Sequence, residues 1–182
     1  MSQKKVFNNL FLLLVVSLVL LPFMVTFNDF LTRTIQSIKL YDLIQSVIVP
    51  IEVKMVAVIL KPFPVDFSVS GSGMTVNGIF AQVTWNCIGW QSLVLFVLSL
   101  LVGFQGHFTN SSKLEAFIIG ALGTFLINLF RMAFIILLLA FSQPLFAVVF
   151  HDYLAAILTI VWLFVFWWFS YSYVLEEKST SN

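Results

Sequence analysis

Cys87 is the only cysteine in this 182-residue chain, in the stretch Trp-Asn-Cys-Ile-Gly-Trp-Gln that begins at residue 85. A thiolate is a strong nucleophile, and it forms readily when a base lies within hydrogen-bond reach. His151 is a candidate base, and Asp152 after it is a candidate to orient the imidazole ring. Adjacent helix residues point in different directions, which limits what Asp152 can do.

Arg131 is the only charged residue in the apolar stretch 116–150. An ionisable side chain in such a segment needs a partner or a polar cavity. Gly120, Thr124, Asn128 and Arg131 follow at spacings of four, four and three, so they share one helical face. A stripe of small and polar residues faces other helices rather than lipid. Arg131 is therefore a candidate to stabilise negative charge developing near the thiol, with Asn128 in support.

We expect Cys87 and His151 each to lie at the amino end of a helix. Unpaired backbone N–H groups there favour a thiolate and disfavour an imidazolium. With Arg131, the pair then gives a nucleophile, a base and a cation at one end of a helical bundle. A structural interpretation remains open, in which the thiol packs, the histidine is solvated and the arginine holds backbone carbonyls.

Composition excludes several other classes of site. One cysteine permits no intrachain disulfide and no multi-cysteine zinc site. Cys87 and His151 alone are too few ligands for a metal, so we expect no cofactor. The nine basic and eight acidic residues form no basic stripe, so nucleic acid is not an expected partner.

Hydrophobic residues make up 60% of the chain and charged residues only 9%. A soluble domain carries about 25% charged residues, so lipid is the expected solvent. The expected fold is an all-α polytopic membrane protein of about four transmembrane helices, with interfacial amphipathic helices and a small extracytoplasmic β-hairpin. The expected parts are an N-terminal span (1–27), an extracytoplasmic or interfacial segment (28–86), a three-helix core (87–174) and a cytoplasmic tail (175–182). The core contains predicted spans at 88–104, 114–141 and 151–173, with a polar loop at 106–113.

The segment 28–86 carries eight charged residues. Leu43, Val47, Ile51 and Met55 recur at helical spacing, which indicates an amphipathic helix in the membrane interface. Glu52 and Lys54 argue against a span here. Further on, alternating residues around Gly71-Ser72-Gly73 predict a hairpin, and Asn77-Gly78 a second turn. In an alternative with five spans, residues 41–60 cross the membrane and everything after them is inverted.

Lys4 and Lys5 before the first span predict a cytoplasmic amino end. With four spans, the segment 28–86 then lies outside, the loop at 106–113 lies inside, and Cys87 and His151 both lie at the outer face. The expected location is the cell membrane, with the site facing away from the cytoplasm.

These residues resemble the exosortase/archaeosortase family over about 62–168. The similar features are a cysteine opening a span, Asn-x-x-Arg in the next span (here Asn128-Leu129-Phe130-Arg131), a histidine opening the following span, and a Trp-rich end. Ile88 departs from the family, which has a small hydroxyl residue after the cysteine. By this resemblance we also expect the chain to correspond to the family's core, without the additional amino-terminal spans of many members.

The resemblance implies a sortase-like cysteine peptidase or transpeptidase. Its substrates would be exported proteins that end in a short motif, a transmembrane helix and a basic cluster. Cys87 would form a thioester, Arg131 would stabilise the oxyanion, and His151 would move the proton. Water or an amine on a lipid or glycan would then resolve the thioester. The alternative function is a non-enzymatic membrane subunit or assembly factor for export of surface polymer or protein.

Overall fold

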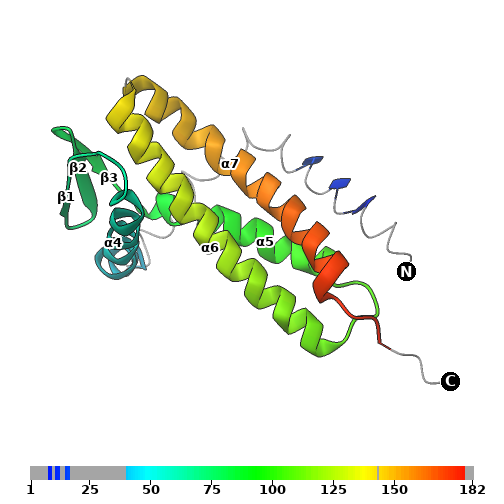
Figure 1. The fold of residues 1–182 in the computed structure, drawn as a ribbon. Helices are drawn as coiled ribbons and strands as arrows, with labels where there is room; N and C mark the ends of the chain where they lie inside the picture. Colours follow the sequence, from blue (N-terminus) through cyan, green and yellow to red (C-terminus); the bar gives the residue numbers. More distant parts are fainter. Residues whose placement is uncertain (1–7, 10, 13–14, 17–39, 143, 179–182) are drawn as a thin grey trace.

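Three long helices form an antiparallel bundle in the computed structural model (Figure 1). They are α5 (Trp90–Gly103), α6 (Asn110–Phe141) and α7 (Pro144–Phe169), which continues into a π-helical turn, η3 (Ser170–Val174). The structure describes residues 8–9, 11–12, 15–16, 40–142 and 144–178. Its described residues at 8–16 are helical, but most of the predicted first span at 1–27 and the tail after residue 178 lie outside the described residues.

The ends of α6 differ from the predicted third span only at the start. Thr109 caps this helix, because its side chain accepts a hydrogen bond from the backbone N–H of Ser112. Residues 110–113, predicted as part of a polar loop, therefore form the first turn of the helix. At the other end Pro144 begins α7, where its fixed φ and missing N–H cost nothing. The predicted break at residues 143–144 separates α6 from α7 as expected.

The predicted polar stripe of α6 faces its neighbours, as expected. Thr124, Asn128 and Arg131 are all buried. Gly120 lies so close to Phe96 of α5 and Phe166 of α7 that a Cβ there would overlap both rings. The small and polar residues thus allow the three helices to pack closely.

Residues 40–60 form one continuous helical stretch, made of α3 (Leu40–Leu43), the π-helical turn η1 (Ile44–Ile48) and α4 (Val49–Leu60). Pro50 does not interrupt it. Proline lacks an N–H and crowds the carbonyl four residues earlier, and the wider π turn before it accommodates both effects.

The apolar residues of the predicted amphipathic pattern lie on the face of this stretch that does not pack on the protein. Leu43, Val47, Ile51 and Met55 are exposed. The buried face carries Val49, Glu52, Val53, Val56, Ala57 and Leu60. Both faces are rich in aliphatic residues, so spacing alone did not distinguish the side that packs on α6.

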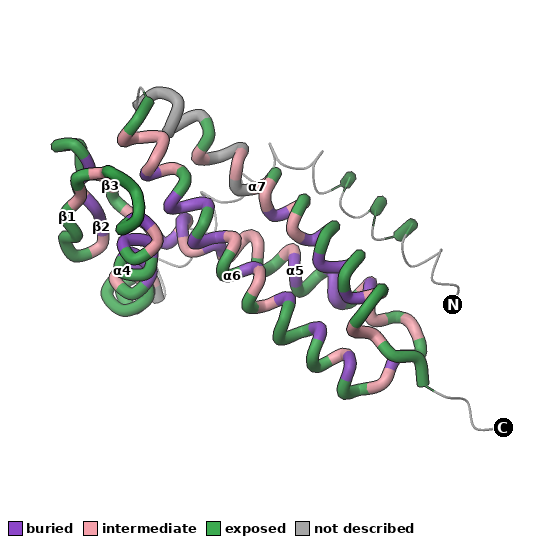
Figure 2. Tube along the Cα trace, viewed as in Figure 1, coloured by how far each residue is buried: buried purple, intermediate pink, exposed green. Residues whose placement is uncertain are grey.

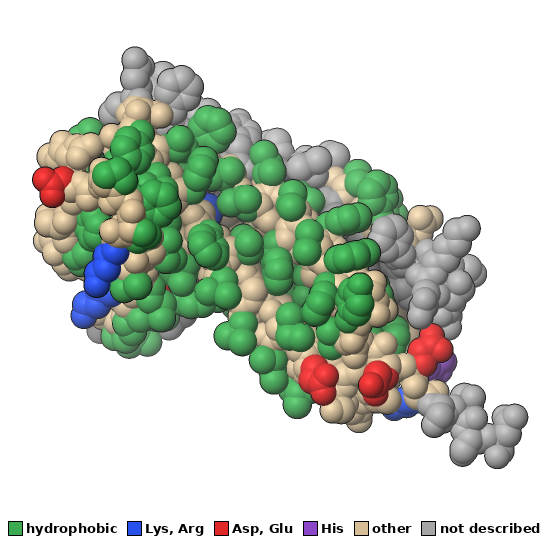
Figure 3. Space-filling view, in the orientation of Figure 1, with side chains coloured by type: hydrophobic (Ala, Val, Ile, Leu, Met, Phe, Trp, Pro, Cys, Tyr) green, Lys and Arg blue, Asp and Glu red, His purple; other side chains and the backbone are tan. Residues whose placement is uncertain are grey.

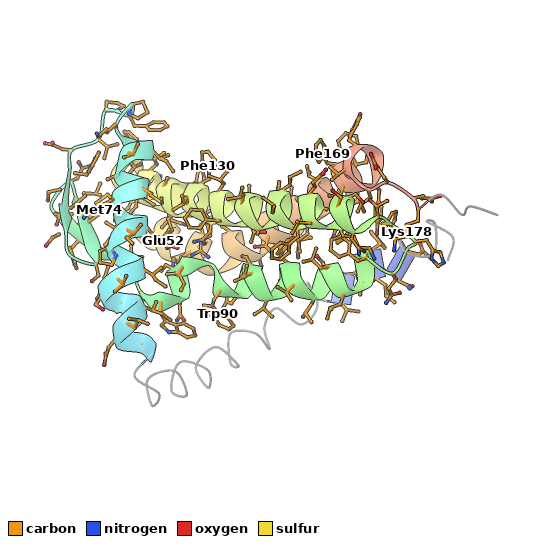
Figure 4. All side chains as sticks on the ribbon, turned by 90° about the horizontal axis from the view of Figure 1, so that it is seen from below. Glu52, Met74, Trp90, Phe130, Phe169 and Lys178 are labelled. Atoms are coloured by element: carbon orange, nitrogen blue, oxygen red, sulfur yellow. The ribbon has the colours of Figure 1, made fainter. Side chains whose placement is uncertain are left out.

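α4 crosses the end of the bundle instead of running along it. It is seen nearly along its axis in Figure 1, where α5, α6 and α7 run across the picture. In Figure 4, turned by 90°, it stands upright against the horizontal helices α5 and α6.

A three-stranded antiparallel sheet lies beside α4, in the order β1 (Phe67–Ser70), β2 (Gly73–Val76), β3 (Ile79–Gln82). Both predicted turns are present. The pairs Ser70↔Gly73 and Val76↔Ile79 each close a two-residue turn. Asn77 and Gly78 both have positive φ, 48° and 82°, as the predicted Asn-Gly turn requires. The Asn77 side chain also donates to the carbonyl oxygen of Ala140, which ties the sheet to the end of α6.

The core has two parts along α6, and Figure 2 shows buried residues where the elements face one another. One cluster joins α4, β2 and Cys87 to the carboxyl half of α6, through Leu129, Met132, Ala133 and Ile136. The other joins α5 and α7 to the amino half of α6, through Ala116 and the aromatic rings of Phe96, Phe166 and Trp167. Cys87 therefore lies where the sheet, α4 and the bundle meet.

Four helical segments of the described residues are long and apolar enough to cross a membrane: Tyr41–Leu60, Trp85–Gly103, Asn110–Phe141 and Ala156–Val174. On the face shown in Figure 3, hydrophobic side chains cover the helices between charged groups at the two ends. The mostly helical architecture expected of a membrane protein is thus present, together with the small sheet. Residues 41–60, predicted to lie in the interface, meet the same requirement of length and composition, so composition leaves the five-span alternative open.

The loop between α5 and α6 lies against the start of the polar tail, far along the bundle from the sheet. The N–H of Thr109 donates to the carbonyl oxygen of Glu176, and that of Lys178 to the carbonyl oxygen of His107. Loop and tail therefore share one end of the bundle, as the predicted topology requires.

Candidate functional site

Cys87 lies in a short 3₁₀ turn, η2 (Trp85–Ile88), between β3 and α5. Its N–H donates to the carbonyl oxygen of Thr84 at 2.8 Å. Gly89, in the left-handed conformation, is the N-cap of α5. Cys87 therefore lies at the amino end of the helical segment Trp85–Gly103, as expected. Its own N–H is already bonded, so this group is not one of the unpaired donors of the helix end.

His151 reaches the thiol from α7. Its Nε2 lies 3.4 Å from Cys87 Sγ, within hydrogen-bond range for sulfur, although the two residues are 64 positions apart. Cys87 is buried and His151 is partly buried. The structure thus brings the candidate nucleophile and the candidate base into contact.

His151 does not begin a helix, in contrast to the prediction. α7 starts at Pro144, so His151 lies about two turns inside it. The charge effect of a helix end fades within the first turn. The amino end of α7 therefore lies too far from His151 to disfavour its imidazolium form, in contrast to the prediction. The helix begins earlier than predicted because residues 145–150 are apolar and include no helix-breaking residue after Pro144.

Asn128 and Arg131 both bind the backbone carbonyl oxygen of Cys87. The Asn128 amide donates at 2.9 Å and the Arg131 guanidinium at 3.1 Å. Their spacing of three on α6 places both on one face, and both side chains are buried. Asn128 and Arg131 therefore hold the backbone of the candidate nucleophile.

Gly89 is the third part of this arrangement. Its φ of 78° lies in the region that side chains with a Cβ rarely adopt. A Cβ at this position would also lie 2.6 Å from Cγ of Asn128. Glycine is thus required both by the turn after Cys87 and by the close approach of Asn128.

Glu52, which was not among the predicted site residues, also belongs to this region. Only 4% of Glu52 is exposed, and the charge of Arg131 acts on its carboxylate. Figure 4 shows it on the side of α4 that faces the bundle. The spacing in the sequence could have identified it. Glu52 follows Val49 by three residues and precedes Val56 by four, so it shares a helical face with these two buried residues.

Thr84 was also missed. Its hydroxyl Oγ1 lies 3.7 Å from Cys87 Sγ. Thr84 therefore places a hydroxyl beside the thiol. Asp152, the other predicted supporting residue, follows His151 on α7, and its side chain lies outside what the structure describes.

A cavity of about 70 Å³ adjoins the thiol. Cys87, Arg131 and His151 supply polar groups to its wall. The rest of the wall is almost entirely aliphatic and comes from α4, β2, β3, α6 and the segment after β3. A thiol, an imidazole and a guanidinium thus meet in a largely apolar space, where charges interact more strongly than in water.

No group of three or more His, Cys, Asp or Glu residues suited to a metal ion occurs in the part of the chain that the structure describes. Comparison of the chain with known proteins gives no matching family model, no similar curated protein and no similar solved structure.

Proposed function

We propose that this protein is a membrane-embedded cysteine peptidase or transpeptidase of the exosortase/archaeosortase type. The observation that carries the proposal is the contact of 3.4 Å between Cys87 Sγ and His151 Nε2 beside an apolar cavity that Arg131 also lines. Nucleophilic catalysis by cysteine needs this pairing of a thiol with an adjacent base.

In the proposed reaction His151 takes the proton of the Cys87 thiol, and the thiolate attacks the carbonyl carbon of a peptide bond. The C–N bond breaks, His151 returns the proton to the leaving amine, and the acyl group stays on sulfur as a thioester. Arg131 stabilises the negative oxygen of the tetrahedral intermediate, an effect that is strong where water is scarce. Water or a primary amine then releases the acyl group, which gives hydrolysis or transfer.

The proposed location is the outer face of the cell membrane, with α5, α6 and α7 as spans. α4 crosses the end of this bundle, which suits a helix lying in the interface on the side of the site. The proposed substrates are exported proteins held by a carboxy-terminal motif, a transmembrane helix and a basic cluster.

The test in cells replaces Cys87 by Ala. Membrane fractions are compared by mass spectrometry between cells with the wild-type protein and cells with Cys87→Ala. We expect the variant at normal abundance and an accumulation of full-length proteins that retain a carboxy-terminal transmembrane helix. Normal processing of such proteins by an abundant Cys87→Ala variant would reject the peptidase.

A second test uses the purified protein. Because Cys87 is the only cysteine, iodoacetamide labels a single site, and its rate reports the reactivity of this thiol. We expect His151→Ala to slow labelling at pH 7 by about tenfold or more, since the adjacent base promotes the thiolate. His107→Ala is the matched control, at the opposite end of the bundle, and should label at the wild-type rate.

A second function is favoured by the two hydrogen bonds to the backbone carbonyl oxygen of Cys87. The hydrogen bonds of Asn128 and Arg131 to the Cys87 carbonyl are also those of a structural clamp, as in a non-enzymatic membrane subunit or assembly factor. That function predicts that Cys87→Ser is silent in cells, because its backbone carbonyl is unchanged. The peptidase predicts loss of processing in the same variant.

A further inference from the structure

β3 is an edge strand that adjoins the cavity at Cys87. In the sheet of the described residues β3 pairs only with β2. Ala81 and Gln82 of β3, with Val83 after it, form part of the wall that also contains Cys87 and His151. The strand therefore leads directly to the thiol.

The register of the sheet fixes which backbone groups of β3 remain available. Val76↔Ile79 closes a two-residue turn, and the N–H of Val83 donates to the carbonyl oxygen of Ser72. In an antiparallel ladder these bonds recur at every second residue. Val83 directs its N–H toward β2, while its carbonyl oxygen accepts a hydrogen bond from the Gln45 side chain. Ile79 and Ala81 thus direct both their backbone N–H and C=O groups toward β2. Those of Phe80 and Gln82 point the other way, and both residues are exposed.

We propose that the substrate binds as an extended strand along the free edge of β3, paired with the backbone of Phe80 and Gln82. This inference rests on the proposed function and specifies how the substrate binds. Pairing of a peptide with a sheet edge supplies affinity through the main chain, and neighbouring pockets select alternate side chains. The paired strand directs its scissile carbonyl to Cys87 at the end of β3.

The adjoining cavity adds a preference for the type of substrate side chain next to the bond that is cut. Its wall beside the thiol contains Val56, Met74 and Ile136, and its volume is about 70 Å³. The aliphatic residues of this wall favour a small aliphatic side chain, because they offer a polar group no hydrogen-bond partner. The partner is therefore an extended peptide with a small aliphatic residue next to the bond that is cut.

The first test replaces Gln82 by Pro, which removes an outward N–H without removing a bond to β2. The matched control is Val69→Pro on β1. Val69 pairs with Met74 one residue away from the turn-closing pair Ser70↔Gly73, so its N–H also points away from β2, but at the opposite edge of the sheet. The probe is a precursor protein that accumulates in cells with Cys87→Ala.

We expect Gln82→Pro to slow processing of this precursor by about tenfold, the effect of losing one main-chain hydrogen bond. Val69→Pro should process it at the wild-type rate. Iodoacetamide labelling of Cys87 at wild-type rates in both variants shows that the site is intact. Equal processing by Gln82→Pro and Val69→Pro rejects pairing at β3 while leaving the peptidase in place. Normal processing by Cys87→Ala rejects the peptidase itself.

A binding measurement covers the case in which Gln82→Pro does not fold. A photo-crosslinking amino acid is placed at Phe80 or at Val69 in the Cys87→Ala background, and cross-links to the precursor are measured after illumination. Both positions are exposed, so the two variants differ in whether the crosslinker lies at the β3 edge or at the β1 edge of the sheet. Cross-linking from position 80 but not from 69 supports the inference. Equal cross-linking from both positions, or none from 80, overturns it.

Discussion

The guanidinium of Arg131 donates a hydrogen bond to the backbone carbonyl oxygen of Cys87, across 44 positions of sequence, at 3.1 Å. A buried cation in an apolar helix is thereby fixed to the peptide unit of the only thiol in the chain. This contact makes Arg131 a positioning residue for Cys87 as well as the proposed stabiliser of the oxyanion. The two roles can be separated by substitution.

Arg131→Lys keeps the positive charge but loses the planar guanidinium. If charge near the oxyanion is the main requirement, this variant retains part of its activity. We expect Arg131→Lys to process precursor about 10²-fold more slowly than the wild type, because the geometry of the donor matters as much as its charge. Processing by Arg131→Lys at the wild-type rate would contradict the role of its geometry.

Asn128→Ala removes one of the two side-chain donors to the Cys87 carbonyl. We expect a loss of about 1–3 kcal/mol in the free energy of unfolding, since a buried hydrogen bond is broken. Thermal unfolding in detergent measures it. Ser111→Ala, at the exposed start of the same helix, is the control and should unfold like the wild type. An unchanged melting temperature for Asn128→Ala would show that this hydrogen bond contributes nothing to stability.

Gly89→Ala tests the turn after Cys87. The added Cβ meets both a positive φ and the Asn128 side chain. Gly71→Ala is a matched control, because Gly71 also has a positive φ, 53°, but nothing within 4 Å of the added Cβ. We expect Gly71→Ala to cost about 1 kcal/mol of unfolding free energy through backbone strain alone. Gly89→Ala should cost clearly more and slow alkylation of Cys87. Equal melting temperatures would mean that Asn128 moves aside at no cost.

Glu52→Gln keeps the shape of a buried side chain and removes its charge. One carboxylate oxygen of Glu52, Oε2, is buried without a hydrogen-bond partner among the described residues. The charge of Arg131 offsets part of the cost of burying this carboxylate. We expect Glu52→Gln to change the free energy of unfolding by about 1–3 kcal/mol and to slow processing, because the field at Arg131 changes.

Lys54→Gln is the control for Glu52→Gln, since Lys54 lies on the exposed side of the same helix. This substitution should leave both stability and processing as in the wild type. Equal effects of the two substitutions would show that the charge of Glu52 has no special relation to the site.

Membrane topology is tested by two single-cysteine variants in the Cys87→Ala background. Ser70→Cys lies in the sheet near the site, and Ser111→Cys lies at the opposite end of the bundle, both at exposed positions. The proposed orientation predicts that a membrane-impermeant maleimide labels intact cells at Ser70→Cys only. Labelling of Ser111→Cys alone would show that the orientation is the reverse of the proposed one and would support the five-span alternative.

A glycosylation assay gives an independent measurement of orientation. Asn110-Ser111-Ser112 has the pattern of a glycosylation acceptor. In a eukaryotic expression system, the proposed orientation predicts no glycan at Asn110. A glycan at this position would agree with labelling of Ser111→Cys and exclude the cytoplasmic placement of the loop.

The features that the sequence predicted well are those set by nearby residues. The Asn77-Gly78 turn follows from two residues that tolerate positive φ. The buried face of α6 follows from Gly120, Thr124, Asn128 and Arg131, because polar groups in an apolar helix must find polar partners. Apolar runs of sufficient length likewise specified the three long helices, although the start of α7 was placed seven residues too late.

The features that only the tertiary structure decided depend on contacts between distant segments. Both faces of α4 are apolar, so packing against α6 alone determined that Glu52 points inward and Ile51 outward. The distance between Cys87 and His151 depends on how α5 and α7 pack on α6, which no local pattern encodes. The sequence by itself therefore determined which residue types and which membrane-compatible helices are present. Packing determined which side chains meet at the thiol, because a close contact across 64 positions depends on the whole fold.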